Sequence, residues 1–418
     1  MAKALSKLKP ELQTLSYPKE RIRALLLENI HPSAVEAFKA EGYQVEALTE
    51  SLTEAELIER LPEVQILGLR SATKLTAPAL AAGKHLLAVG AFCIGTNQID
   101  LAAAAQNGTA VFNAPYSNTR SVVELALGEI IMLLRHTVAR NTEMHAGTWR
   151  KTAAGSYEAR GKRLGIVGYG NIGSQLSVLA EALGMQVSFY DTTDKLAFGN
   201  ARRAASLTEL LTSSDIVTVH VDGRPENRRL IGEAEFAAMK PGALFLNLSR
   251  GFVVDDAALA AALRRGHLAG AAADVFPTEP GKGEPFESPL RGLPNVILTP
   301  HVASGTQEAQ QHIGQFVSSK LISFINTGNT NLSVNLPNLE LPAQRGVHRL
   351  IHIHRNEPGV LAKINAIVAA SGANVTGQYL GTSPHAGYVI TDIAQDYSLE
   401  VKSRLAELPE TIRVRLLF

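Results

Sequence analysis

The stretch that decides the fold is KRLGIVGYGNIG, residues 162–173. A short apolar run, 164–167, leads into the spacing Gly168-x-Gly170-x-x-Gly173, and a segment of helical period follows at 172–183. Where a strand turns through such glycines into a helix, the backbone can approach a pyrophosphate closely, and the positive helix N-terminus attracts it. This context predicts a dinucleotide-binding site. The alternative is a glycine-rich turn without a ligand.

An acidic residue ends the next predicted strand. The run MQVSFYD, 185–191, closes on Asp191, which stands 18 residues after Gly173. A carboxylate at this position accepts hydrogen bonds from the adenosine ribose hydroxyls and repels a 2′-phosphate. The sequence therefore favours NAD, while Lys195 is a nearby cation that leaves NADP as the alternative.

On both sides of this stretch, short apolar runs alternate with segments of helical period, which predicts an α/β fold with parallel sheets. One long helix over 118–146, with Asn118 or Thr119 at its start, is expected to bridge two series of strands. The predicted strands are 23–29, 43–48, 64–71, 86–92 and 109–115 in the first series, and 162–170, 185–191, 215–221, 243–249, 269–276 and 295–301 in the second.

The order of elements changes after a helical run at 305–326. Residues 328–346 are rich in Gly, Asn and Pro and have no periodicity, which is typical of a linker. Residues 347–418 follow the order strand, helix, strand, strand, helix, strand, which is the ferredoxin-like split motif. The sequence therefore predicts a third, separate domain.

Composition excludes several other classes of protein. The 418 residues are 45% apolar with a formal charge of +1, so no overall field attracts nucleic acid or an anionic membrane. Cys93 is the single cysteine, and the most apolar stretch, 122–134, contains Glu124 and Glu129, which excludes a disulfide framework and a membrane span there. The start, MAKALSKLKPELQ, lacks a secretion signal, so we expect residues 1–20 to be a flexible lead in a cytoplasmic protein.

Three ionisable residues follow three successive strands of the second series: Arg250, Glu279 and His301. The carboxyl ends of parallel strands meet at one edge of the sheet, so these side chains are expected to converge. Oxidation of a secondary alcohol needs a base, a partner that orients the base, and a cation for a substrate carboxylate. His301, Glu279 and Arg250 supply these types. Taken singly, each could instead be a surface or structural residue.

Several motifs now resemble a known family. Four strings are similar to the D-2-hydroxyacid dehydrogenases: GYGNIG at 168–173, NLSRG at 247–251, DVFPTEP at 274–280 and TPH at 299–301. Others resemble the short bacterial phosphoglycerate dehydrogenase branch of that family, which carries a C-terminal ACT domain: RS at 70–71, CIGTN at 93–97, NAP at 113–115, SNTR at 117–120, HIH at 352–354 and PGV at 358–360. The resemblance covers nearly the whole chain after about residue 20.

This resemblance implies two doubly wound domains and an ACT domain. The Rossmann cofactor domain, 118–304, is inserted in a flavodoxin-like substrate domain made of 21–117 and 305–335, and a regulatory ACT domain covers 340–418. The implied activity is that of an NAD-dependent oxidoreductase that converts 3-phosphoglycerate to 3-phosphohydroxypyruvate, the first step of L-serine biosynthesis. The implied assembly is a homotetramer under allosteric inhibition by L-serine.

The resemblance also implies residue roles. His301 is expected to exchange the proton, Glu279 to hydrogen-bond His301, and Arg250 to bind the substrate carboxylate. Cofactor contacts are expected at Gly168, Gly170, Asn171, Ile172, Gly173, Asp191, Leu248, Ser249, Arg250, Asp274, His301, Val302, Ala303 and Ser304. Substrate contacts are expected at Arg70, Ser71, Ile94, Gly95, Asn118 and, from another subunit, Lys151. L-Serine contacts are expected at His354, Asn356 and, from the facing subunit, Asn374.

Two departures from the family pattern keep alternatives open. Val302-Ala303-Ser304 follows His301 where relatives commonly have a glycine pair, and Ala72 stands where some relatives carry a second arginine. The alternative functions are a dehydrogenase of another 2-hydroxy acid, such as 2-hydroxyglutarate, and a nonenzymatic NAD-sensing regulator.

No metal site and no nucleic-acid site are expected. His352 and His354 share a strand face, but no cluster of Cys, Asp or Glu completes a ligand set. Trp149, beside two cations, suits an interface or a solvated loop better than a base-stacking platform.

Overall fold

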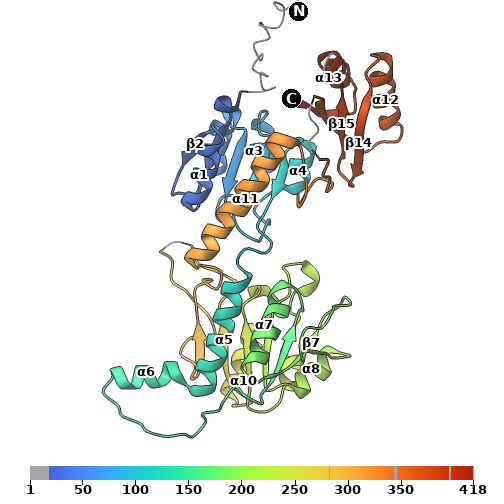
Figure 1. Ribbon diagram of the computed structural model, residues 1–418. Coiled ribbons are helices and arrows are strands. Elements are labelled where there is room, and N and C mark those ends of the chain that lie inside the picture. Colours follow the sequence, from blue (N-terminus) through green and yellow to red (C-terminus); the bar gives the residue numbers. More distant parts are fainter. Residues whose placement is uncertain (1–17, 282, 343–345, 395–396, 418) are drawn as a thin grey trace, which may run out of the picture. The chain divides into compact units, whose positions relative to one another are not determined.

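The computed structural model describes residues 18–281, 283–342, 346–394 and 397–417. It divides into two compact units: unit 1 runs up to Pro115 and resumes at Gln310, and unit 2 runs from Tyr116 to Ala309 (Figure 1). Most of the predicted lead, 1–20, lies outside the described residues. No helix in the described ranges has the length and apolar character needed to cross a bilayer.

Unit 1 contains a five-stranded parallel sheet in the order β2-β1-β3-β4-β5, which is the flavodoxin-like order. Its central strands are buried on both faces, which explains why their sequences are apolar without alternation. The strands are β1 (Arg23–Leu26), β2 (Gln44–Ala47), β3 (Ile66–Leu69), β4 (Ala88–Ala91) and β5 (Ala110–Phe112). The helices between them are η1 (Lys19–Arg21), α1 (Pro32–Ala40), α2 (Glu54–Arg60), η2 (Leu61–Glu63), α3 (Ala77–Ala82) and α4 (Leu101–Gln106).

A helix that follows unit 2 in the sequence completes this layer. α11 (Gln307–Thr327) packs with α1 on one face of the sheet, while α2, α3 and α4 cover the other (Figure 1). A Cβ at Gly90 on β4 would lie 2.7 Å from a methyl group of Val317, so glycine at this position allows α11 to approach the sheet. The chain therefore returns to its first sheet after leaving it.

The segment expected to be a linker is bound to β5. The Asn335 side chain accepts a hydrogen bond from the Val111 N–H at 2.8 Å and donates one to the Thr109 carbonyl at 2.9 Å. Ser333 donates to the Val111 carbonyl at 3.2 Å. Within 328–342 the chain has no helix or strand, yet these bonds hold it along the sheet edge.

The C-terminal part of unit 1 has the predicted strand and helix order and forms an antiparallel sheet, β14-β15-β13-β16. One face packs on its own helices through Leu350 and Val389, and the other packs toward Phe324 of α11 through Ile351 and Tyr388. The elements are β13 (His348–His354), α12 (Val360–Ala370), β14 (Val375–Thr382), β15 (Gly387–Ile393), α13 (Ser398–Ala406) and β16 (Thr411–Leu417).

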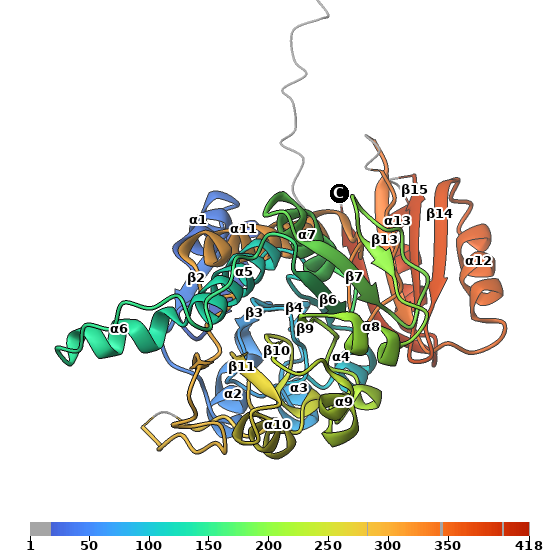
Figure 2. The ribbon, with the colours of Figure 1, turned by 90° about the horizontal axis from the view of Figure 1, so that it is seen from below.

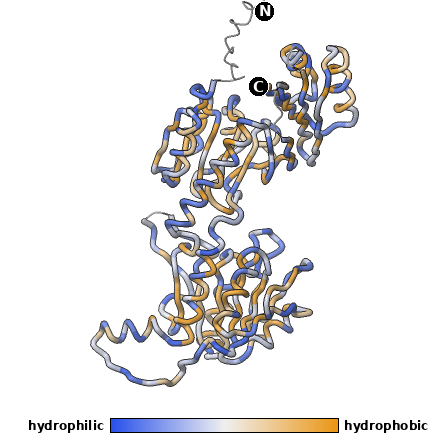
Figure 3. Tube along the Cα trace, viewed as in Figure 1, coloured by the Kyte–Doolittle hydropathy of each residue, from blue (hydrophilic) through white to orange (hydrophobic). Residues whose placement is uncertain are grey.

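Unit 2 is built on a seven-stranded parallel sheet in the order β12-β11-β10-β9-β6-β7-β8. α5 and α7 cover one face, and α8, α9 and α10 cover the other (Figure 2). In both parallel sheets the strands are largely hydrophobic (Figure 3). The strands are β6 (Arg163–Val167), β7 (Gln186–Tyr190), β8 (Arg202–Arg203), β9 (Ile216–Val219), β10 (Ala243–Asn247), β11 (Leu268–Ala273) and β12 (Val296–Leu298). The helices are α5 (Thr119–Arg135), α6 (Thr137–His145), α7 (Asn171–Ala182), α8 (Leu207–Ser213), η3 (Pro225–Asn227), α9 (Glu233–Ala238), η4 (Gly251–Val253) and α10 (Asp256–Arg264).

The prediction of one continuous helix over 118–146 is wrong. His136 adopts the left-handed conformation, with φ 50° and ψ 35°, and ends α5 before α6 begins. Its ring Nε2 is 2.9 Å from the Gly155 carbonyl, a contact with a distant loop that fixes the break. The predicted cap residue Asn118 occupies the cap position, but its side chain makes no capping hydrogen bond.

Candidate active site

The carboxyl ends of the unit 2 strands form one continuous edge. Val167 pairs with Val219, and Asn247 pairs with both Val219 and Ala273. Ala273 in turn pairs with Leu298. The residues that directly follow these strands therefore lie in a row, as predicted for the glycine loop, Arg250, Asp274 and the segment before His301.

The glycine loop has the shape that a pyrophosphate needs. A Cβ at Gly168 would lie 2.7 Å from the His220 carbonyl oxygen, and one at Gly173 would lie 2.3 Å from the Gly168 carbonyl oxygen. At Gly170, in contrast, the Cβ position has no atom within 4 Å, and no side chain caps α7 there. The first N–H groups of α7, from Asn171 on, are therefore free to meet an anion, so these residues fit a dinucleotide.

Asp191 is held in place by hydrogen bonds to both carboxylate oxygens. Oδ2 accepts from the Tyr169 N–H at 2.9 Å, and Oδ1 accepts from the N–H and the hydroxyl of Thr193, each at 2.9 Å. Partial burial acts to raise the pKa of Asp191, but the bonds from Thr193 and Tyr169, with the charge of Lys195, bring it below the usual value. Asp191 is therefore charged at neutral pH.

The structure adds a cation that sequence reasoning missed. Arg203 donates to the carbonyls of Asp191, at 3.2 Å, and of Thr193, at 3.4 Å, and its other nitrogen pairs with Asp194 at 2.6 Å. The pairing of β8 with β7 brings Arg203 beside the end of β7. Because its bonds go to carbonyls and to Asp194, Arg203 secures the turn that presents Asp191.

His301 and Glu279 form a hydrogen-bonded pair. His301 Nδ1 lies 3.0 Å from Glu279 Oε2, and both side chains are close to half exposed. His301 has a φ of 54°, and its backbone N–H donates to the Asp274 carbonyl at 2.8 Å, which fixes where the ring leaves the loop. No described residue hydrogen-bonds Nε2, so this atom is available to a substrate.

Arg250 lies at the same carboxyl edge of the unit 2 sheet, three residues after the end of β10. A Cβ at Gly251 would lie 1.9 Å from the backbone of Phe276, so the loop that carries Arg250 touches the loop that carries Glu279. The Arg250 guanidinium donates to the Ser249 carbonyl at 2.7 Å. Among the described residues no carboxylate forms an ion pair with Arg250, although its charge helps to lower the pKa of Asp222, so the guanidinium can still pair with an anionic ligand.

Asp274 organises the segment that departs from the family pattern. Its side chain is buried and accepts from the Val302 N–H and the Ala303 N–H, both at 2.9 Å, and from the Thr299 hydroxyl at 2.6 Å. These bonds give 302–304 a defined backbone without a glycine pair. The neighbouring Ser249 is buried and bonds Asn247.

Four predicted substrate residues share an edge of the unit 1 sheet. Arg70 and Ser71 follow β3, and Ile94 and Gly95 follow β4, its parallel neighbour. The Gln98 side chain donates to the carbonyls of Arg70 and Gly95 and joins the two loops.

The other two predicted substrate residues belong to unit 2. Asn118 is buried, and within the described part of the chain its Oδ1 atom has no hydrogen-bond partner. Lys151 is exposed.

Two of the predicted serine residues, His354 and Asn356, lie at the turn after β13. His354 Nδ1 is 2.7 Å from the Arg355 carbonyl oxygen, and Asn356 donates to the Ser383 carbonyl at 3.0 Å. Asn374 is exposed and precedes β14. The His352 ring bonds the Thr411 hydroxyl at 2.7 Å, and the described residues contain no group of His, Cys, Asp or Glu suited to a metal ion.

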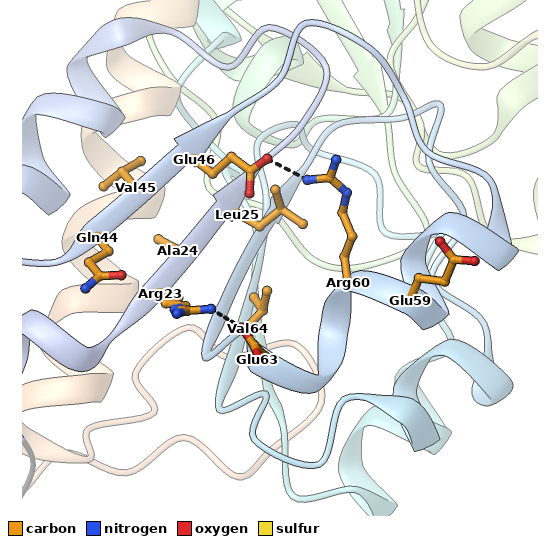
Figure 4. Close-up of a pocket in the computed structure, with 10 residues that line it drawn as sticks. All are labelled: Arg23, Ala24, Leu25, Gln44, Val45, Glu46, Glu59, Arg60, Glu63 and Val64. Carbon is orange, nitrogen blue, oxygen red and sulfur yellow. Dashed lines mark hydrogen bonds and ion pairs between the residues drawn. The ribbon is translucent and has the colours of Figure 1, made fainter.

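A polar hollow of about 440 Å³ lies elsewhere in unit 1, beside β1, β2 and α2 (Figure 4). Arg23 pairs with Glu63, and Arg60 pairs with Glu46, so its cations are neutralised by its own carboxylates. It opens near the amino ends of the strands, opposite to the edge where ligands bind in such sheets. We assign no ligand to it.

Comparison with known proteins places this geometry in a family. Residues 127–303 match the NAD-binding domain of D-isomer specific 2-hydroxyacid dehydrogenases, and 350–413 match an ACT domain of the type found in the AHAS small subunit. The chain is 50% identical over 408 residues to D-3-phosphoglycerate dehydrogenase of Escherichia coli K12, which covers 97% of this chain and 99% of the relative. The chain belongs to the D-3-phosphoglycerate dehydrogenase family.

Two further similar proteins support this family assignment. The Dictyostelium discoideum D-3-phosphoglycerate dehydrogenase is 49% identical over 406 residues, with 97% of this chain and 99% of the relative covered. The solved structure of D-2-hydroxyisocaproate dehydrogenase superposes with a TM-score of 0.68 at 26% identity, over 75% of this chain and all of that one. The predicted fold class, the NAD-dependent enzyme class and the cofactor NAD are thereby confirmed.

In this NAD-dependent family, cofactor choice gives a direct test of Asp191. In Asp191→Ala we expect kcat/KM for NAD to fall and discrimination against NADP to relax, because both the ribose acceptor and the charge that repels a 2′-phosphate are lost. Initial rates with the two cofactors measure this. Glu158→Ala removes an exposed carboxylate of the same unit whose partner, Arg160, has no bond to this turn, and it should keep the NAD preference. A wild-type enzyme that prefers NADP would contradict the assignment.

Proposed function

We propose that this enzyme catalyses the reversible oxidation of 3-phosphoglycerate to 3-phosphohydroxypyruvate, with NAD as the oxidant. The observation that carries the proposal is the full-length similarity to relatives with the name D-3-phosphoglycerate dehydrogenase. When bound, NAD accepts the hydride that leaves C2 of the substrate. This reaction is the first step of L-serine biosynthesis.

Residues of the protein accept the C2 hydroxyl proton and bind the charged carboxylate of the substrate. His301 takes the proton of the C2 hydroxyl at Nε2, because Nδ1 is already bonded to Glu279. Glu279 orients the ring and stabilises the imidazolium that forms. Arg250 fixes the substrate carboxylate by charge-assisted hydrogen bonds. In the reverse direction His301 returns the proton to the carbonyl oxygen.

The substrate phosphate is assigned to Arg70, at the edge of the unit 1 sheet. Arg70 follows β3, and the Ser71 hydroxyl and the Ile94–Gly95 backbone add hydrogen-bonding groups at that edge. Asn118 and, from a second subunit, Lys151 complete the proposed set. With Ala72 in place of a second arginine, the phosphate has fewer cations, and this leaves 2-hydroxyglutarate as the second candidate substrate.

One experiment separates the two substrates. The loss of NADH absorbance is followed after addition of 3-phosphohydroxypyruvate or of 2-oxoglutarate to the full-length enzyme. We expect a higher kcat/KM with 3-phosphohydroxypyruvate. A higher value with 2-oxoglutarate would transfer the assignment to 2-hydroxyglutarate, and no turnover with either would point to a different 2-hydroxy acid.

We propose that the ACT domain binds L-serine and inhibits the enzyme. The supporting features are the match to an ACT domain and the turn after β13, where Gly359, with φ 86°, precedes α12. His354 ends β13 and Asn356 lies within this turn, and the N-terminus of α12 offers N–H groups to a carboxylate. Inhibition requires that serine bind one arrangement of the enzyme better than another.

Asn356→Ala is expected to weaken serine inhibition, because the amide that would bond the ligand is removed. Titration of activity with L-serine measures the shift in the inhibitory concentration. Asn365→Ala changes an exposed amide on α12 that bonds Gln378, and should leave the titration unchanged. Unchanged inhibition in Asn356→Ala would exclude this site, and a wild-type enzyme without any response would leave the domain structural.

Assembly, location and domain roles complete the proposal. We assign a homotetramer with contacts between ACT domains and between catalytic domains, in the cytoplasm, without a nucleic-acid or membrane partner. The substrate domain comprises 21–117 and 305–335, the NAD-binding domain 118–304, and the regulatory domain 340–418. The exposed edge strand β14, with Tyr379 and Leu380, is the surface that would pair between ACT domains.

A further inference from the structure

A fully buried acid lies in unit 2 outside the site described above. Glu129 on α5 has no exposed surface, and neither of its carboxyl oxygens has a hydrogen-bond partner among the described residues. Burial, and then the charge of Asp274, raise the pKa of Glu129 to about 8. A buried carboxylate without partners is far less stable than the neutral acid, so Glu129 carries a proton at neutral pH.

Asp274 is the ionisable residue whose charge affects the pKa of Glu129. α5 packs on two helices, α6 and α7, and on three strands, β10, β11 and β12. These strands contain no ionisable residue, but Asp274 directly follows β11. The charge of Asp274 is the one that acts on Glu129. The remaining ionisable side chains on α5 and on the helices packed against it are Arg120, Glu124, Arg135, Arg140, Glu143, His145 and Glu181.

The two acids differ in their hydrogen bonds. Asp274 accepts three hydrogen bonds, from Thr299, Val302 and Ala303, so its carboxyl group serves as an acceptor in the structure. Neither carboxyl oxygen of Glu129 accepts a hydrogen bond from a described residue, and once protonated this carboxyl has an O–H group to donate. A carboxylate with lone pairs left beside a carboxylic acid forms a charge-assisted O–H···O⁻ hydrogen bond.

We propose that Glu129 is a positioning residue for the cofactor loop: its protonated carboxyl donates to Asp274 and thereby holds the Val302–Ala303 backbone in place. The inference rests on the proposed assignment of Asp274 and 301–304 to the NAD site. Glu129 would then have a structural role, which its position in an apolar helical segment of the sequence does not indicate.

Two substitutions separate the donor from the volume of the side chain. Glu129→Gln keeps an N–H donor, whereas Glu129→Met fills a similar space without one. The dissociation constant for NADH is measured by fluorescence titration of the full-length enzyme. We expect Met to weaken NADH binding by about tenfold, as for loss of one hydrogen bond to a charged group, and Gln to stay close to the wild-type value.

The pH dependence gives a readout that a packing role would not change. As pH rises through about 8, Glu129 ionises beside the ionised Asp274, the donor is lost and the two charges repel. NADH binding to the wild type should therefore weaken in this range, and binding to Glu129→Gln should not. Glu124→Gln, a change of an exposed acid on the same helix, should retain the wild-type profile.

Failure of the inference and failure of the assigned NAD site give different results. If Asp274→Asn leaves NADH binding unchanged, Asp274 does not serve the cofactor, and the site assignment is wrong. Infrared spectroscopy tests the proton without cofactor: a carboxyl C=O band should disappear above pH 8 in the wild type and be absent from Glu129→Gln. Wild-type NADH affinity in a folded Glu129→Met enzyme, or the absence of that band, would overturn the role of Glu129.

Discussion

Replacement of His301 by alanine is expected to lower kcat by about 100-fold to 10,000-fold, the range that one positioned general base contributes. The ring is the group that can take the hydroxyl proton, because Glu279 occupies Nδ1 and leaves Nε2 toward the substrate. NADH binding should change little, since the backbone N–H of residue 301 and the bonds of Asp274 to Val302 and Ala303 remain. Steady-state kinetics and NADH titration of the same preparation separate the two effects.

Two further variants make this result specific. Glu279→Gln keeps a side chain at hydrogen-bond distance but removes the charge, so kcat should fall while NADH affinity stays. His312→Ala removes an exposed histidine of α11 and should have no effect on turnover. Wild-type turnover in His301→Ala would mean that another group accepts the proton.

Much of this site could be predicted because the sequence pattern of a buried parallel strand, and of the turn that follows it, is recognisable. The apolar run before Gly168 identifies a buried strand, and the glycine spacing identifies its turn. The residues just after a parallel strand necessarily lie at the carboxyl edge of the sheet. Arg250 and Glu279 could therefore be assigned to one edge without knowledge of any side-chain contact. The His301–Glu279 distance confirms that these two groups meet.

What could not be predicted depends on contacts between distant segments. The break at His136 has no glycine or proline to mark it and is held by the carbonyl of Gly155. Arg203 reaches the Asp191 turn because β8 pairs with β7, although β8 is only two residues long. Glu129 sits in an apolar helical pattern that does not reveal Asp274 beside it. In each case the position follows from tertiary packing, which local sequence does not encode.

Breaking the buried ion pair of the ACT domain should have the largest effect on stability. Arg349 and Asp392 face each other across β13 and β15, with two hydrogen bonds of 2.8 and 2.9 Å, and the Asp392 side chain has no exposed surface. The guanidinium also donates to the carbonyls of Thr327, Leu341 and Pro342, so it joins the ACT sheet to the end of α11. The Asp392→Ala variant would keep this cation buried without its counter-ion.

We therefore expect Asp392→Ala to lose about 3–5 kcal/mol of unfolding free energy, the usual effect of removing one member of a buried pair. Urea unfolding of the full-length protein measures it. Glu400→Ala, which breaks an exposed pair with Arg404, should change the unfolding free energy by less than about 0.5 kcal/mol. The double variant Arg349→Met with Asp392→Leu removes both charges, and it should recover much of the loss, because an apolar replacement leaves no buried cation unpaired. Recovery would show that the loss of stability comes from the unpaired cation. If the double variant is as unstable as Asp392→Ala, the three hydrogen bonds from Arg349 to backbone carbonyls would be the main contribution to stability.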